Sequence, residues 1–474
     1  MTSRLNGRYR LQNLWLPEAW CGALLFCVLA PVLGLRMLPY LMRIPESAAE
    51  KCLGAVSLGI LTTALLADFV YRVVSFFTGG GFLIGLIISN VVVFITQMSL
   101  ARCRPKIPTA TSDLRHWNLR TNTTTTRIAL AVFASIGIIS FFSPVLGNDQ
   151  YEYFAVANQW SINGVHGYPP VTGSLEGAVV APSSHPTAYH TFIAALGLSG
   201  MPILFHLIFN TVVAASILYI AGFARQPGFY ILIFCGTPIF ISQLVSKSID
   251  PVWISGLQLG VLSIFIQCRN VRSLGLTTTH FLSSLCSLAV AMALVVGFHS
   301  TGLIGLVLLS ASLLIVLRPS VQMLGAMFCS GLLALLISNQ YLVNLRRYGS
   351  PVQDSAPVFD LPALEFATDL VIRRGLITTW DKLFNGALRG FTDYFAFGLV
   401  AWIALVSLVV LIYSSRKVHH QQFVYLQAVL FICLLLFFVS SATLGVDLVI
   451  KNARYWQLFL PSMAALAGSV AWRE

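Results

Sequence analysis

The chain has 474 residues, of which 57% are hydrophobic and only 10% charged, and its formal net charge is +12. Soluble domains carry about 25% charged residues, so this composition excludes an ordinary soluble enzyme, a disordered chain and a secreted disulfide scaffold. It indicates a polytopic membrane protein whose basic residues belong to loops and helix ends rather than to a nucleic-acid surface.

Apolar runs long enough to cross a bilayer follow one another along most of the chain. A bilayer core of about 30 Å requires about 20 apolar residues in a helix. We therefore predict an all-α polytopic membrane protein with about 12–13 transmembrane helices. The runs lie near residues 20–41, 53–71, 76–100, 128–146, 201–223, 227–245, 252–268, 280–298, 301–317, 321–340, 395–413, 422–443 and 456–472.

Basic residues orient these spans and divide the chain into parts. Six arginines and lysines between positions 102 and 127 predict a cytoplasmic loop there. We expect extra N-terminal transmembrane helices and this loop in 1–127, a transmembrane core in 128–340, a long outer loop in 341–394 and C-terminal transmembrane helices in 395–474. The core contains a first outer loop at 147–200, and amphipathic surface helices are expected in both outer loops. The first hundred residues fit the alternation least well, because it places an arginine-containing amino terminus outside.

The first outer loop contains the acid of greatest interest. Asp149 comes a few residues after the apolar run ends and should therefore lie at the outer membrane boundary, where it either caps a helix or acts as a general base. Glu152 and Tyr153 follow within one turn, and Glu152 also suits the first turn of a helix. His185 and His190 come before the next apolar run.

Three more ionisable residues lie at predicted outer helix ends. Asp250 precedes Pro251 and follows Lys247, a pattern typical of a helix start as well as of a site acid. His299 lies at the next outer turn and is either a packed polar residue or a ligand.

Cations in the later outer segments break the usual charge rule. The loop 341–394 carries several arginines, including Arg346, and the turn before the last run carries Arg454. Cations on an outer face suit phosphate groups of lipids or of a substrate, or else a headgroup-facing surface helix. The nine cysteines form no C-x-x-C pair, so neither disulfides nor a zinc site is expected.

Four stretches in order carry a family resemblance. They are Gly147–Tyr153, His185–His190, Asn344–Pro351, and Arg454 and Tyr455 with Pro461. Together they resemble the GT-C superfamily of membrane glycosyltransferases, which includes polyprenyl-phosphate-dependent mannosyl- and aminoarabinosyltransferase-like proteins. The resemblance covers roughly residues 128–472. Many members have a lysine where this chain has His299.

The resemblance implies an inverting transferase in a bacterial inner membrane. Asp149 would be the catalytic base, and the other nine candidates would bind substrate: Glu152, Tyr153, His185, His190, Lys247, Asp250, His299, Arg346 and Arg454. The partners would be a lipid-linked sugar donor and a glycan, lipid or protein acceptor, with no nucleic acid. No cofactor or metal is expected to be obligatory, although Asp149 with Glu152 or Asp250 offers two oxygen ligands for a divalent ion. A cell-envelope polysaccharide polymerase or ligase, which would depend on arginine pairs such as Arg346 and Arg347 more than on one acid, and a transporter or lipid flippase remain alternatives.

Overall fold

The computed structural model describes most of the apolar runs. It describes residues 17–42, 45–78, 91, 117–119, 123–143, 171–172, 179–180, 186–196, 202–274, 278–348, 375–385, 397, 399–413, 422–443 and 453–470. The architecture is all-α, as predicted, with one two-residue antiparallel strand pair, β1 (Val171–Thr172) and β2 (Val179–Val180).

The N-terminal half begins with a helical hairpin. Its elements are α2 (Pro17–Leu41), α3 (Ala48–Thr78), α5 (Thr124–Phe142), α7 (Ala188–Leu196) and α8 (Pro202–Ala221). Small residues let the backbones of α2 and α3 touch, since a Cβ added at Gly59 would lie 1.9 Å from the Ala30 carbonyl oxygen. Close approach at small residues is how helices associate in a bilayer.

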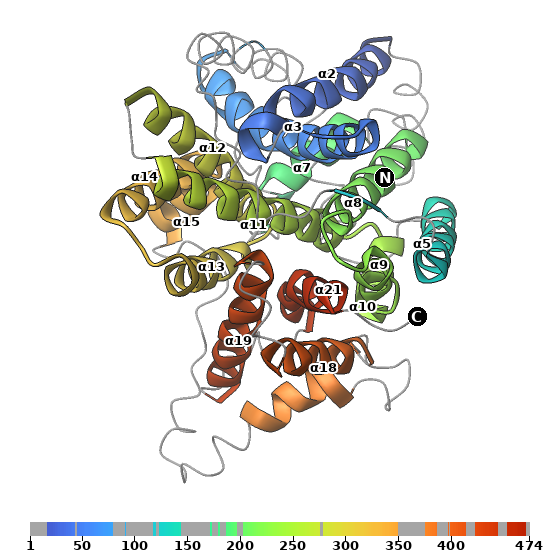
Figure 1. Cartoon of the computed structure of the whole chain (residues 1–474). Coiled ribbons are helices and arrows are strands. Elements are labelled where there is room, and N and C mark those ends of the chain that lie inside the picture. The colour runs from blue at the N-terminus through green and yellow to red at the C-terminus, as the bar shows by residue number, and fades with distance from the viewer. Residues whose placement is uncertain are drawn as a thin grey trace.

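The centre of the molecule is α11, which the other helices surround (Figure 1). The elements of this part are α9 (Pro227–Cys235), α10 (Pro238–Val245), α11 (Ile249–Leu274), α12 (Thr278–Val296), α13 (Gly302–Leu317), α14 (Val321–Ile337) and α15 (Gln340–Tyr348). The membrane-length part of α11 is wholly buried inside the protein. The run 227–245, predicted as one span, is instead two helices bent by 70°. The break follows from Gly236 and from Pro238, which lacks an N–H and disfavours helix at the residue before it.

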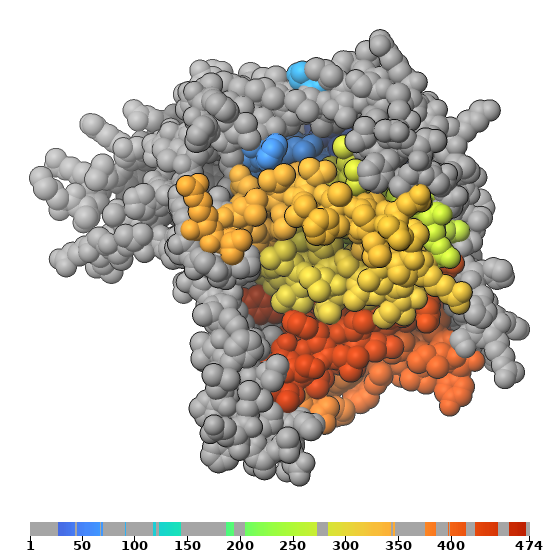
Figure 2. Space-filling model, turned by 90° about the vertical axis from the view of Figure 1, so that its left-hand side faces the viewer, coloured from blue at the N-terminus to red at the C-terminus, as the bar shows by residue number. Residues whose placement is uncertain are grey.

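The C-terminal part packs against the far side of α11. It contains the π-helix η3 (Asp381–Asn385), α18 (Leu399–Tyr413), α19 (Gln422–Thr443), the 3₁₀ helix η5 (Ala453–Phe459) and α21 (Leu460–Ser469). On the face in Figure 2, the yellow α13 and α14 separate blue α3 from red α19.

Within the described residues, five helices are long and apolar enough to cross a membrane, or six if the bent pair counts as one span. Shorter apolar helices of 10–17 residues occupy several of the other predicted runs. Large apolar side chains remain exposed on the peripheral helices, for example Phe142 at 78% and Phe328 at 69%. Exposed apolar side chains on long apolar helices are expected where a protein faces lipid. The chain is therefore a multi-pass integral membrane protein.

Candidate functional site

Polar groups gather where several helix ends meet at one end of the bundle. The ends of α5, α10 and α12 and the starts of α11, α13 and η5 meet there, as the contacts of Ser140, Lys247 and His299 described below show. At the opposite end, Asn118 N donates to Gly222 O at 2.8 Å and Gln226 N to Gly468 O at 2.7 Å. The basic residues Arg127, Arg225, Arg269, Arg272 and Arg318 lie near helix termini at that opposite end. The polar cluster thus lies at the end away from these arginines, which is the outer end by the charge rule.

The turn between α10 and α11 is closed in an unusual way. The N–H of Ser248 donates to Gln243 O at 2.9 Å and that of Lys247 to Leu244 O at 3.4 Å, which is the Schellman pattern of a helix end. Lys247 has φ +58°, in the left-handed region where such turns normally place glycine. A lysine there carries a backbone strain that glycine would not.

The Lys247 side chain is buried against the end of α5. Its Nζ donates to the carbonyl oxygen of Ser140, to Ser140 Oγ at 2.9 Å and to Val245 O at 3.0 Å. It also lies 6.0 Å from the centre of the Phe209 ring. The ammonium thus joins the carboxyl-terminal ends of α5 and α10, where helix dipoles favour positive charge. Because burial removes it from water, the pKa of Lys247 falls from 10.5 to about 8.

Asp250 and His299 form the second half of the cluster. His299 Nε2 lies 4.0 Å from Asp250 Oδ1, and both side chains are almost completely buried. Ser248 Oγ donates to Asp250 Oδ2 at 2.7 Å. The Thr301 N–H donates to His299 Nδ1 at 3.1 Å, so the neutral imidazole carries its proton on Nε2, the nitrogen that faces Asp250. His299 is therefore suited to orienting the carboxylate.

Aromatic rings enclose His299. Trp253 stacks on it with ring centres 4.7 Å apart, and Tyr455 meets it edge-on at 5.9 Å. Tyr341 donates its hydroxyl to the carbonyl oxygens of Val296 at 2.6 Å and His299 at 3.2 Å. These contacts join α11, the α12–α13 turn, α15 and η5 around one imidazole.

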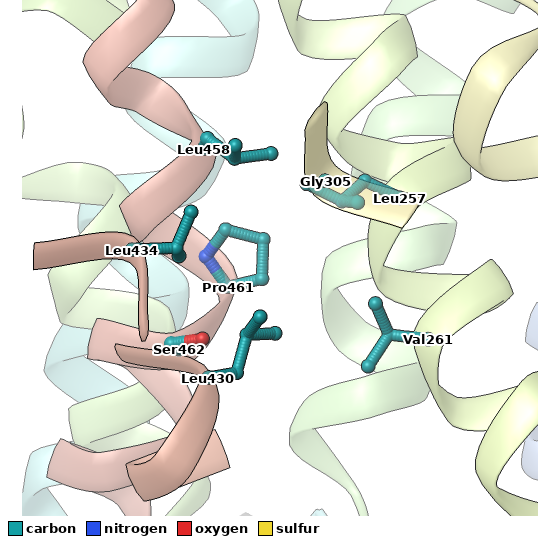
Figure 3. A pocket seen from close by; sticks show the side chains of 8 residues that line it. All are labelled: Leu257, Val261, Gly305, Leu430, Leu434, Leu458, Pro461 and Ser462. Carbon is teal, nitrogen blue, oxygen red and sulfur yellow. The ribbon is translucent and has the colours of Figure 1, made fainter. Parts of the chain in front are cut away.

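An apolar pocket lies on the same helices, further from the outer end. It is small, with a cavity volume of about 10 Å³, and Leu257 and Val261 of α11 form one wall (Figure 3). Asp250 lies seven and eleven positions before these residues and therefore shares their helix face. The other lining residues are Gly305, Leu430, Leu434, Leu458, Pro461 and Ser462. A polar cluster and an apolar slot therefore follow one another along one face of α11.

The structure brings together some of the predicted site residues. Lys247, Asp250 and His299 lie in the cluster described above, and His190 is buried on α7. Arg346 is exposed on α15 and lies five positions from Tyr341, which places the two on different sides of that helix. The remaining candidates lie outside the described residues: Asp149, Glu152, Tyr153, His185 and the side chain of Arg454.

Sequence reasoning missed several members of the cluster. Trp253 and Tyr341 resemble ordinary membrane-protein aromatics in the sequence, and Ser140 lies within an apolar run. Lys247, two positions before the start of α11, was recognised in the sequence, but the sequence does not reveal its φ angle.

Metal-binding potential is limited in the described part of the chain, where no group of three or more His, Cys, Asp or Glu side chains is close enough to hold an ion. The arrangement there can accept hydrogen bonds at Asp250 and place positive charge at Lys247.

Comparison with known proteins assigns no family. The chain matches no protein-family model, no curated protein and no solved structure.

Proposed function

We propose that this protein is an inverting membrane glycosyltransferase that moves a sugar from a polyprenyl-phosphate donor to an acceptor hydroxyl at the outer face. The observation that carries the proposal is the succession of a buried polar cluster and an apolar pocket along one face of α11. A lipid-linked sugar has the same two parts, a polar head at the membrane boundary and an apolar chain within the bilayer.

Asp149 is the proposed base. In the sequence, Asp149 comes six positions after Ser143, which ends α5. Six residues of fully extended chain reach about 20 Å, so this is the greatest distance that can separate Asp149 from the end of α5. The carboxylate takes the proton of the acceptor hydroxyl as that oxygen attacks the anomeric carbon. The bond from this carbon to the phosphate oxygen breaks, the lipid phosphate leaves with the electron pair, and the configuration inverts.

The described residues have supporting roles in this proposal. Asp250, whose Oδ2 accepts a hydrogen bond from Ser248 and whose Oδ1 lies 4.0 Å from His299 Nε2, accepts hydrogen bonds from sugar hydroxyls. Lys247 supplies positive potential near the leaving phosphate, and Arg454 contacts it. Because Asp250 and His299 are sealed from solvent, sugar entry requires the chain that covers them to move aside.

The bend between α9 and α10 favours a transporter instead, because broken membrane helices hold substrates in many transporters. Such sites usually place ionisable groups at the break. The sequence from Ile233 to Phe240 contains no charged residue. We therefore place the transporter second.

The test is sugar transfer by detergent-solubilised protein, in which transport does not register. A radiolabelled polyprenyl-phosphate sugar is supplied with an extract of envelope lipids and glycans as acceptor. Asp149→Asn should lower kcat by about 10²–10⁴-fold, the usual contribution of a positioned base. Asp381→Asn, an acid of the second outer loop, is the matched control and should retain wild-type transfer. In the same assay Val261→Phe fills the pocket and should raise the donor KM, whereas Val307→Phe on the exposed face of α13 should not.

Wild-type transfer by Asp149→Asn would exclude this mechanism. If Arg346→Ala combined with Arg347→Ala abolished activity while Asp149→Asn was mild, a polymerase or ligase would be the better assignment.

A further inference from the structure

The helix α7 belongs to the first outer loop but is buried. Tyr189, His190, Phe192 and Ile193 are all inaccessible to solvent. The helix packs against α2, α3 and α8, and in Figure 1 it lies beneath α3. A loop helix inserted among membrane helices requires something to hold its polar groups there.

Asp68 of α3 holds one side of α7. Thr187 Oγ1 donates to both carboxylate oxygens, at 3.0 and 2.9 Å, and Thr191 Oγ1 donates to Oδ1 at 2.7 Å. The exposed fraction of Asp68 is 4%, and that of each threonine is 1%. Thr187 and Thr191 are one helical turn apart and present their hydroxyls to the same carboxylate.

The other side of α7 is tied to the candidate site. Tyr189 lies midway between the two threonines and therefore on the opposite face of the helix. Its hydroxyl donates to the carbonyl oxygen of Lys247 at 2.5 Å. Hydrogen bonds on the two faces of α7 thus connect Asp68 on one side to the turn that carries Lys247, just before Asp250, on the other.

We propose that Asp68 is a positioning residue: its hydrogen bonds to Thr187 and Thr191 fix α7, which in turn fixes the turn of Lys247 and Asp250. The role in catalysis rests on the proposed function, whereas the anchoring of α7 does not. This inference gives the N-terminal helical hairpin, which precedes the region of family resemblance, a task in building the site.

Burial favours a state in which the Asp68 carboxylate stays hydrogen-bonded to the threonines of α7. A buried carboxylate that loses its hydrogen-bond donors carries a large desolvation penalty. Undocking of α7 is therefore strongly opposed. An asparagine can preserve the pattern, because its oxygen accepts from Thr191 and its amide donates to Thr187 Oγ1.

Amide hydrogen exchange of the purified full-length protein in detergent tests the anchoring directly. In Asp68→Ala, the peptide covering 187–196 should exchange about tenfold faster or more, while a peptide from α13 should be unchanged. Thr191→Val should give a smaller acceleration, and Asp68→Asn should restore the wild-type rate. Thr62→Val is the matched control, since the buried Thr62 hydroxyl donates only to carbonyls of its own helix, Leu58 and Gly59.

The outcomes separate cleanly. Exchange of α7 within twofold of wild type in Asp68→Ala overturns the anchoring, as does failure of Asp68→Asn to restore it. If Asp68→Ala accelerates exchange everywhere, Thr187→Val and Thr191→Val decide, and wild-type exchange of α7 in both overturns the proposal.

The sugar-transfer assay tests the catalytic consequence. Asp68→Ala should lower kcat/KM for the donor at least about tenfold, and Asp68→Asn should recover it. Faster α7 exchange with an unchanged kcat/KM would overturn the positioning role. If wild-type protein transfers no sugar at all, the proposed function fails, whereas the exchange result still decides the anchoring.

Discussion

The positive φ of Lys247 predicts an exception to the rule that glycine is less favourable than alanine in a helix. Replacing a residue by glycine normally destabilises a helix relative to alanine by about 1 kcal/mol. At position 247 the backbone has φ +58°, a conformation that costs a residue with a Cβ about 1–2 kcal/mol and glycine almost nothing. We therefore expect Lys247→Gly to be more stable than Lys247→Ala.

The expected difference follows from two opposing contributions. Glycine relieves the left-handed strain but loses about 0.4–1 kcal/mol through the greater freedom of the unfolded chain. The net advantage of glycine over alanine should be about 0.5–1 kcal/mol. Both variants lack the ammonium that binds Ser140 and Val245, so their difference isolates the backbone.

Equilibrium unfolding in mixed micelles of increasing SDS content, followed by tryptophan fluorescence, measures this difference. Gly137 supplies the opposite control: it lies within α5, and nothing lies within 4 Å of an added Cβ. Gly137→Ala should therefore stabilise the protein by up to about 1 kcal/mol. If Lys247→Ala proved at least as stable as Lys247→Gly, the left-handed turn would be refuted.

Two further variants test charge and packing. Because the pKa of Lys247 falls to about 8 when the protein folds, the unfolded chain binds more protons between about pH 8 and 10.5. The free energy of unfolding of wild type relative to Lys247→Met should therefore rise across that window, by at most about 1.4 kcal/mol per pH unit; a flat difference would contradict the burial of the ammonium. Gly59→Ala should lower the free energy of unfolding by about 1–3 kcal/mol, because the added Cβ would meet the Ala30 carbonyl oxygen at 1.9 Å, and stability equal to that of Gly137→Ala would show that α2 and α3 do not touch there.

Apolar run length was enough to predict most of the helices. The run 301–317 corresponds to α13 (Gly302–Leu317) and 422–443 to α19, because a stretch without charge has no alternative to a helix in lipid. The bend at Gly236 was missed although glycine and proline marked it, since hydropathy alone does not register backbone geometry. The burial of α7 was missed for another reason: an apolar segment that faces protein has the same composition as one that faces lipid.

Some residue pairs at the candidate site meet because they lie on consecutive antiparallel helices, whereas other pairs are far apart in the sequence. The helices α11 and α12 are antiparallel neighbours joined by residues 275–277, so residues about equally far from that connection must meet. Asp250 and His299 satisfy this condition, and so do Trp253 and the carbonyl of Val295, which accepts its indole N–H at 3.2 Å. Their proximity was therefore predictable once both runs were taken as helices. Asp68 and Thr187 are 119 positions apart with other helices between them, so only tertiary packing brings them together. Contacts of this second kind, which no local pattern encodes, connect the N-terminal hairpin to the site.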